Sequence, residues 1–442
     1  MVTAQTAAPS HAGDDERVTT PPPRWRSLLP GPGLTLGLLL VATALTRLVW
    51  LNRPDKALIF DESYYVNAAR RVLGWVVPDD GPYADSPAGL DPNTEHPPLG
   101  KLLIAGSMRL FGDDPLGWRF PSLAAGVVVV LCVYLLAQSV GQSVGQSVSQ
   151  SGGRDPWLPV YAAGVVMLDN LLLVHSRIAT LDVLFLAPVL VGAVLVMRGR
   201  YLWAGVACGV AVLVKVPAVF GLGALLVLVL VVPGGGTFLL RLRRAVVLGG
   251  VATVVATAGL WLLDVLYTDF DSPIAHFRHI TSYGLELSRT GGPVNSESDP
   301  WQWLSNDVQI PYLRVDTNEV VGGDVVTTKP SVFFRGAMNP ALTGVALTAL
   351  AYAGWRWVRL RDRVACWAVV WAAGVFVPFM VLSLVSHRIS YLFYALPLVP
   401  AYAVAAALLL WHEGLPRACR WGFAVALILG FAAYFPFREL MP

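Results

Sequence analysis

Residues 181–232 read LDVLFLAPVLVGAVLVMRGRYLWAGVACGVAVLVKVPAVFGLGALLVLVLVV. Three apolar runs follow one another here, and the only charged side chains are those of Asp182, Arg198, Arg200 and Lys215. Apolar runs of about 17–25 residues cross the hydrocarbon core of a bilayer as helices, and slightly shorter runs nearly do so. The stretch therefore predicts three consecutive helices at membrane depth.

The same character extends over the whole chain of 442 residues, of which 55% are hydrophobic and only 14% are charged. A water-soluble globular protein carries about 25% charged residues, and part of any protein surface must face its solvent. Soluble, disordered, collagen-like and coiled-coil folds are excluded on this ground. The formal net charge of +3 is too small to indicate a nucleic-acid partner. We therefore predict an all-α integral membrane protein.

Apolar runs of spanning or near-spanning length continue along the chain. One run, 99–111, is ambiguous, because as a helix it measures only about 20 Å and it carries Lys101 and Arg109. The other runs lie at 34–51, 118–138, 157–174, 178–197, 201–214, 216–232, 244–263, 341–358, 364–385, 390–411 and 419–437.

Arginines in the short connections decide whether 99–111 crosses the membrane. If it does not cross, the arginines of four short loops fall on the same side as Arg24 and Arg26, as the positive-inside rule requires. If it crosses, all four loops move outside and break the rule. We therefore predict eleven spans, with the N-terminus in the cytoplasm and the C-terminus outside. The loop arginines are Arg198, Arg200, Arg241, Arg243, Arg244, Arg356, Arg359, Arg361, Arg363, Arg417 and Arg420.

This topology divides the chain into a disordered cytoplasmic tail, 1–33, and one transmembrane domain, 34–442. Two long loops, 52–117 and 264–340, face outward, and each holds ten of the 29 acidic residues. Two large acidic outer loops suit an enzyme that works at the outer membrane face better than they suit a transporter. The repeat GQSVGQSVSQS at 141–151 is typical of a flexible linker.

The first outer loop begins with Phe60-Asp61-Glu62-Ser63-Tyr64-Tyr65. Between positions 65 and 75 apolar residues recur at helical spacing, with arginines on another face, which favours an amphipathic helix along the membrane surface. At its N-terminal end, Asp61 and Glu62 either complement the helix dipole or supply a general base. A base here needs a cationic neighbour, because burial favours the protonated carboxyl group.

Several cations lie at outward helix ends. Lys215 interrupts the apolar stretch 201–232, and Arg177 and Arg388 lie at two outward junctions. Such residues either snorkel to the interface or serve a function at membrane depth, where they fit a phosphate or diphosphate. His96 is either a surface histidine or a substrate contact. Cations for a phosphate, a lipid-facing cleft and a base for an acceptor hydroxyl together suit an enzyme with a lipid-linked phosphate donor.

These motifs resemble those of the polyprenol-phosphate-mannose protein O-mannosyltransferases, above all the actinobacterial members. That family (glycosyltransferase family 39) belongs to the membrane-embedded GT-C glycosyltransferases. The similarity runs in order from about residue 30 to residue 437. The matching segments are Phe60-Asp61-Glu62…Tyr65, His96-Pro97-Pro98-Leu99-Gly100-Lys101, Gly117-Trp118-Arg119, Ser176-Arg177…Leu181-Asp182, Trp203-Ala204-Gly205…Lys215, Pro300-Trp301-Gln302-Trp303-Leu304 and Tyr391-Leu392-Phe393-Tyr394-Ala395-Leu396-Pro397.

The resemblance implies a GT-C fold of eleven spans with juxtamembrane helices in the first outer loop. It also implies an inverting transfer of a sugar, by analogy mannose, from a polyprenyl-phosphate donor at the outer face of the plasma membrane. Asp61 would take the proton from the acceptor hydroxyl, and Glu62 would shape the sugar or acceptor site. The donor phosphate would be held by Arg177, Lys215, Arg119 and Arg388, and substrate contacts would come from Tyr65, His96, Lys101, Asp182 and Trp301. No essential metal is implied, although other GT-C branches use a divalent ion.

The chain departs from the family's pattern in its second outer loop. That loop, 264–340, contains no β-trefoil insertion and none of the cysteines of bacterial relatives, and Val214 precedes Lys215 where relatives carry a more polar residue. The donor site should therefore carry over better than the acceptor site. A protein Ser/Thr hydroxyl is the expected acceptor, and a lipid or glycan hydroxyl, as in the similar lipid A aminoarabinose transferases, is the alternative. A lipid or solute transporter is the alternative from another class.

Overall fold

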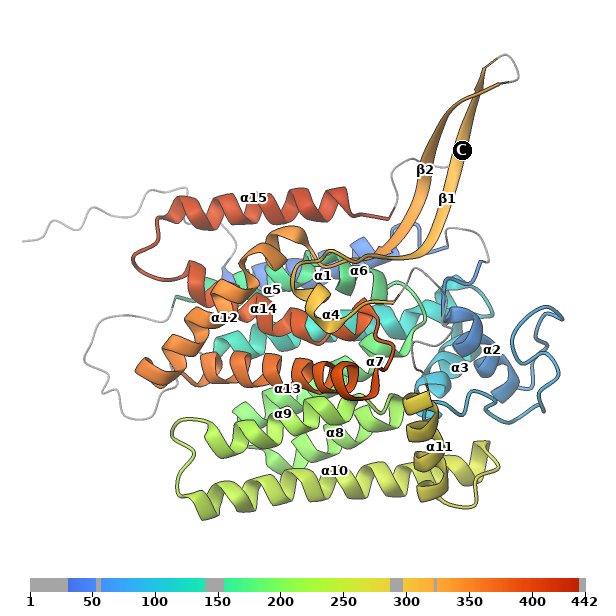
Figure 1. The fold of residues 1–442 in the computed structure, drawn as a ribbon, viewed down its shortest axis with the longest axis horizontal. Coiled ribbons are helices and arrows are strands. Elements are labelled where there is room, and N and C mark those ends of the chain that lie inside the picture. Colours follow the sequence, from blue (N-terminus) through green and yellow to red (C-terminus); the bar gives the residue numbers. More distant parts are fainter. Residues whose placement is uncertain (1–30, 53–56, 140–154, 287–296, 322–323, 437–442) are drawn as a thin grey trace, which may run out of the picture.

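The computed structural model describes residues 31–52, 57–139, 155–286, 297–321 and 324–436. Long helices lie side by side along the longest axis of the molecule (Figure 1). Three shorter helices, α2 (Glu62–Val72), α3 (Leu99–Phe111) and α11 (Pro273–Glu286), gather at one end, and a two-stranded ribbon projects from that same end. Polar loops and apolar helices are thus segregated, as the sequence predicted.

Each of the eleven predicted apolar runs coincides with a helix. On length and composition α4, α10 and α13 are each able to cross a membrane, and six others are apolar helices of 10–17 residues. The chain is a multi-pass membrane protein. The helices are α1 (Pro32–Leu48), α4 (Pro115–Gln138), α5 (Trp157–Met167), α6 (Asn170–His175), α7 (Leu181–Met197), α8 (Tyr201–Val214), α9 (Ala218–Val231), α10 (Phe238–Tyr267), α12 (Pro340–Leu360), α13 (Arg363–Ser386), α14 (Leu398–Leu410) and α15 (Arg417–Ala433).

Two of the predicted runs are interrupted. The run 157–174 divides into α5 and α6, because the side chain of Asp169 accepts a hydrogen bond from the backbone N–H of Leu172 and starts a new helix. In the run 390–411, the 3₁₀ turn η3 (Leu392–Ala395) precedes α14, which begins after Pro397. Both breaks fall inside runs that the sequence predicted to be continuous.

The outer loops fold into more structure than the sequence predicted. In the second loop α11 is followed by the 3₁₀ turn η2 (Pro300–Leu304) and by strands β1 (Ile310–Val321) and β2 (Asp324–Gly336). The two strands form an antiparallel ribbon that pairs Ile310 with Gly336 at its base. Among the described residues, this ribbon is the β-sheet of an otherwise helical fold. The tail 1–30 and the repeat 141–151 lie outside the described residues.

Close backbone contact joins α8 to α10 and so fixes the outermost layer of the bundle. A Cβ atom added at Gly205 would lie 2.7 Å from the carbonyl oxygen of Leu248 and 2.8 Å from Cβ of Val251. The most apolar window of α10 is only 17% buried inside the protein, and α10 lies at one edge of the bundle (Figure 1). The outward face of α10 is therefore available to lipid.

Replacing Gly205 by alanine should destabilise the protein by about 1–3 kcal/mol, the usual cost of overpacking. The added methyl group meets a backbone carbonyl, which cannot move aside without separating α8 from α10. Thermal unfolding in detergent, followed by circular dichroism, measures the effect. Gly250→Ala on α10 is the matched control, because nothing lies within 4 Å of its Cβ position. Equal melting temperatures for the two variants would contradict the close α8–α10 contact.

Candidate active site

A cavity of about 680 Å³ opens where the first outer loop meets the start of α9, α11 and the η3 turn. Five of the residues singled out in the sequence line this cavity: Asp61, Tyr65, His96, Lys215 and Arg388. They come from four separate segments of the chain, so the fold brings them together. The remaining lining residues are Phe60, Tyr64, Tyr83, Asn93, Glu95, Val216, Pro217, Val219, Phe220, Phe277, Ile280, Thr281, Tyr283, Gly284, Leu285, Tyr391, Phe393 and Tyr394.

Asp61 is the residue immediately before α2, and its side chain is half-buried. No hydrogen bond from the described residues reaches its carboxylate. Burial raises the pKa of Asp61 from 3.8 to about 6, the positive charge of Lys215 lowers it, and the negative charge of Asp182 raises it. The result is a free carboxylate that is ionised at neutral pH and poised to accept a proton.

The backbone before Asp61 is held in a strained conformation. Phe60 has φ of 56°, in the left-handed region that bulky residues avoid. Its ring packs against Tyr312 of β1, with centroids 4.7 Å apart, and against Phe393, at 6.0 Å. Tyr312 in turn hydrogen-bonds His175, 2.8 Å from its hydroxyl oxygen to Nε2. Such a strained backbone persists where surrounding contacts hold it in place. Here the contacts of the Phe60 ring fix the orientation of the next residue, Asp61.

Lys215 ends α8 in an extended conformation, and its side chain is only 4% exposed. Its Nζ donates a hydrogen bond of 2.8 Å to Oδ1 of Asp182 and lies 5.3 Å from the ring centroid of Phe393. A lysine that snorkelled would place its ammonium in water. The snorkelling alternative is therefore wrong for Lys215, which is held at the wall of the cavity.

Arg388 supplies a second cation to the same cavity. It follows His387, which ends α13 with φ of 49°. Its guanidinium carbon lies 5.9 Å from the centroid of the Tyr394 ring. Its Nε is buried and has no hydrogen-bond partner within the described part of the chain. A buried unpaired donor is unfavourable unless a ligand satisfies it, so Arg388 is suited to an anionic ligand.

The opposite wall is built from the loop that follows α2. The rings of His96 and Tyr65 lie 5.9 Å apart. Burial and then the charge of Lys215 hold the pKa of His96 well below its usual value, so the imidazole is neutral. Beside it, Asn93 donates a hydrogen bond of 2.8 Å to the carboxylate of Glu95. No role was assigned to Glu95 from the sequence, although this residue directly precedes His96 of the motif.

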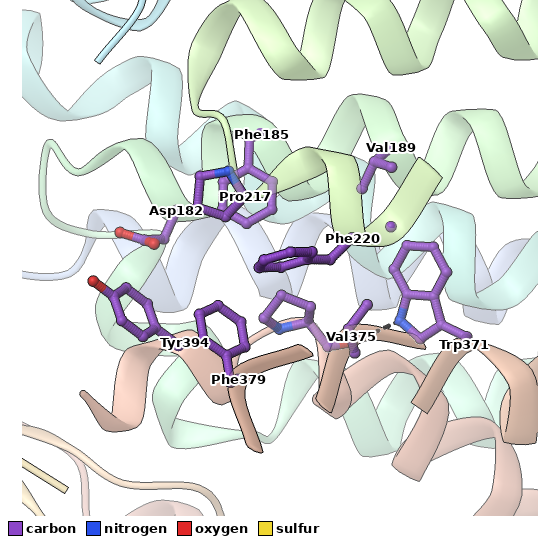
Figure 2. A pocket seen from close by; sticks show the side chains of 11 residues that line it. Asp182, Phe185, Val189, Pro217, Phe220, Trp371, Val375, Phe379 and Tyr394 are labelled. Carbon is purple, nitrogen blue, oxygen red and sulfur yellow. Dashed lines mark hydrogen bonds between the residues drawn. The ribbon is translucent and has the colours of Figure 1, made fainter. Parts of the chain in front are cut away.

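A narrow crevice adjoins the cavity, and Pro217, Phe220 and Tyr394 line both. Figure 2 shows Asp182 and Tyr394 at one end of it and Trp371 at the other, with apolar side chains between them. Its volume is about 10 Å³, which holds no more than one water molecule. Asp182 thus reaches the cavity through its ion pair with Lys215 rather than by lining it.

Comparisons with known proteins show which proteins this chain is similar to. The family described as "Dolichyl-phosphate-mannose-protein mannosyltransferase" matches residues 95–261. The polyprenol-phosphate-mannose–protein mannosyltransferase of Mycolicibacterium smegmatis is 27% identical over 88% of this chain and 84% of that protein. The proteins of the same name from Mycobacterium tuberculosis (26% identical, covering 86% and 82%) and Corynebacterium glutamicum (24%, covering 80% and 78%) align in the same way. The chain is thus similar over most of its length to protein mannosyltransferases of this name.

Solved structures of the GT-C type share the fold of this chain. The Pmt1–Pmt2 protein O-mannosyltransferase complex of S. cerevisiae, bound to its sugar donor, superimposes with a TM-score of 0.67 at 12% identity, covering 92% of this chain and 90% of that one. ArnT of Cupriavidus metallidurans, bound to undecaprenyl phosphate, gives a TM-score of 0.58 at 20% identity, and the alignment covers 91% of this chain and 64% of ArnT. At these identities the likeness shows the fold.

Glu62 was expected to shape the sugar or acceptor site, but its side chain does not line the cavity. Its side chain is fully buried, and both of its oxygens accept hydrogen bonds. Nε and Nη2 of Arg119 donate to it at 2.8 Å each, and the backbone N–H groups of Ile59 and Ala179 donate at 2.7 Å each. A carboxylate with four donors has no capacity left for a sugar or an acceptor. Glu62 and Arg119 therefore pair with each other, and neither side chain lines the cavity.

Three further expected site residues lie away from the cavity lining. Lys101 is buried and paired with Asp91 at 2.8 Å, and it also donates to the carbonyl oxygen of His96. Arg177 donates to backbone carbonyl oxygens at the end of α1. Trp301 is 45% exposed on η2. The hydrogen bonds of Lys101 and Arg177 tie loops and helices together.

No metal centre is found in the part of the chain that the structure describes, since no three His, Cys, Asp or Glu side chains there are grouped to hold one ion. The charged and hydroxyl-bearing side chains that line the cavity are those of Asp61, Glu95, Lys215, Arg388 and several tyrosines.

Glu62→Gln should destabilise the protein by about 3–5 kcal/mol, because it leaves the buried Arg119 guanidinium without its counter-charge. Asp61→Asn, one residue earlier, breaks no such pair and should leave stability within about 0.5 kcal/mol, as for other substitutions away from packed networks. Thermal unfolding of both variants in detergent measures the difference. Equal stability of the two variants would show that Glu62 does not hold the loop.

Proposed function

We propose that this chain transfers a sugar, in the first instance mannose, from a polyprenyl-phosphate donor to a hydroxyl group of a protein serine or threonine, with inversion at the anomeric carbon. The reaction takes place at the outer face of the plasma membrane, with the N-terminus in the cytoplasm. The similar mannosyltransferases support the donor and the reaction, because they are named for them. The arrangement of arginines in the short loops supports the orientation.

One observation carries the proposal: a free carboxylate, Asp61, shares a cavity with two cations, Lys215 and Arg388. The carboxylate takes the proton of the acceptor hydroxyl as its oxygen attacks the anomeric carbon. The bond from that carbon to the phosphate oxygen breaks, and its electron pair leaves with the polyprenyl phosphate. Attack and departure on opposite faces of the carbon give inversion. A base and an anion-binding pair are the two things that this displacement requires.

The leaving phosphate gains a full negative charge as the bond breaks. With the phosphate bound between Lys215 and Arg388, which line the same cavity, both cations would stabilise that charge, and Arg388 has a buried donor to offer it. Before the donor binds, Lys215 is neutralised by Asp182. A phosphate that approaches Lys215 shares it with Asp182, so the cation stays fixed in position and needs little reorganisation. Pre-positioned charges of this kind stabilise transition states most effectively.

The remaining walls divide into two sorts. Apolar side chains along one part of the cavity offer a path for the prenyl chain. They are Val216, Val219 and Phe220 around the start of α9, and Phe277 and Ile280 on α11. Glu95, Asn93 and several tyrosines are polar or amphipathic and suit sugar hydroxyl groups. The proposed donor thus lies with its lipid tail along α9 and α11 and its sugar toward the first outer loop.

Asp61→Asn should abolish transfer, with a loss of at least about 10²-fold, the low end for a general base, and should leave donor binding intact. The test incubates purified protein in lipid with radiolabelled polyprenyl-phosphate-mannose and a Ser/Thr-rich peptide. Asp79→Asn is the matched control, since Asp79 is an exposed acid of the same loop outside the cavity.

Undiminished turnover by Asp61→Asn would remove Asp61 from the role of base. Label that appears in lipid or glycan rather than in peptide would change the acceptor and leave the reaction standing. Label that moves into no acceptor, with the donor bound, would overturn the transferase assignment in favour of transport.

The pH dependence of kcat/KM should show an acid limb near pH 6. Asp61 must be ionised to accept a proton, and its pKa is raised to about 6 by burial. Below that pH the rate should fall by about tenfold per unit, since only the ionised fraction is active. The phosphodiester of the donor keeps its charge in this range. Lys215→Met should move the limb to higher pH, because Lys215 lowers the pKa of Asp61. A flat profile down to pH 4.5 would contradict the role of Asp61.

A further inference from the structure

A second cavity, of about 460 Å³, lies at the end of α8 opposite Lys215. It is bounded by the turn before α8 and by the first three turns of α10. With α8 14 residues long, about 21 Å of helix separates this cavity from the candidate active site. The lining residues are Gly199, Arg200, Tyr201, Leu202, Trp203, Leu240, Arg243, Arg244 and Val247.

None of the described residues that line this cavity is acidic. Between Asp182 and Asp264 the sequence contains no acidic residue. Arg244 is held in place, since it donates to the carbonyl oxygen of Gly235 at 2.6 Å and lies 5.3 Å from the Tyr201 ring. Arg200 and Arg243 are exposed, and within the described residues their side chains form no hydrogen bond or ion pair. Three guanidinium groups therefore face one space without a counter-charge.

Apolar side chains surround these arginines and are exposed as well. Leu202 is 50% exposed, Trp203 is 61% exposed and Val247 is 36% exposed. They continue onto the outward face of α10, which is mostly unburied. Tryptophan is enriched where a membrane meets water, because its ring is apolar and its N–H is polar. The cavity thus combines three arginines with exposed apolar side chains that continue onto the lipid-facing surface of α10.

We propose that this cavity binds the headgroup of an anionic glycerophospholipid from the leaflet opposite the active site, the cytoplasmic leaflet in the topology given above. The phosphodiester lies among Arg200, Arg243 and Arg244, and the acyl chains run along Trp203 and the outward face of α10. A soluble phosphate would use the arginines and leave the apolar side chains exposed. A zwitterionic lipid would use the apolar side chains and leave the charge uncompensated. Only an anionic lipid satisfies both parts.

The test measures lipid binding and is independent of transferase activity. Purified full-length protein in neutral detergent is titrated with phosphatidylglycerol, and bound lipid is counted by native mass spectrometry, with phosphatidylcholine as reference. Arg200→Gln/Arg243→Gln is the informative variant, because neither side chain makes a bond that the fold uses. Arg359→Gln/Arg361→Gln removes the same charge from the α12–α13 connection, where both arginines are exposed and line neither cavity.

Phosphatidylglycerol should bind wild type more tightly than phosphatidylcholine does. The Arg200→Gln/Arg243→Gln variant should lose roughly 30-fold in affinity, five- to sixfold for each arginine near a membrane surface, and the control variant should lose less than twofold. Equal loss in both variants would overturn the site, since it would reflect overall charge alone. Stronger dependence on the same arginines for undecaprenyl phosphate than for phosphatidylglycerol would overturn it in favour of a carrier-lipid site.

Discussion

The buried carboxylate of Glu62 is the constraint on which the geometry of the cavity depends. It joins three parts of the chain that are distant in sequence: the start of α2, Arg119 on α4 and the backbone of Ala179 before α7. A fully desolvated charge tolerates only an arrangement in which all its partners are present. The position of the first residue of α2 is therefore fixed relative to the bundle, and with it the position of Asp61.

Adjacent carboxylates thus have opposite roles, and their surroundings decide which is which. Glu62 accepts four hydrogen bonds, whereas the oxygens of Asp61 accept none from the described residues. The two are indistinguishable in the sequence, where both were assigned to catalysis. Asp61, Lys215 and Arg388, which line the cavity, could be picked out in the sequence because isolated charges beside apolar runs are few. Arg119 could not be assigned, because its partner is 57 residues away in sequence and only the fold brings them together.

The helices were predictable because spanning a bilayer demands long apolar runs, and each such run became a helix. The break at Asp169 was hidden because a single buried acid within an apolar run gives no sign of whether it caps a helix or lines a site. The ribbon β1–β2 was hidden for another reason. A two-stranded ribbon that extends away from the bundle (Figure 1) has no core to impose an apolar pattern on its sequence.

The base of that ribbon is attached to the bundle, where Tyr312 contacts Phe60 and His175 and where Phe334 lies against the guanidinium of Arg177. The rest of it extends outward from the membrane-embedded helices (Figure 1). One end of the hairpin is thus anchored to the bundle, and the other end projects away from it. During evolution, the outer part can lengthen, shorten or be replaced by another module while the residues at the base hold Asp61 in position. Variation in the outer part of the hairpin is therefore uncoupled from the geometry of the cavity.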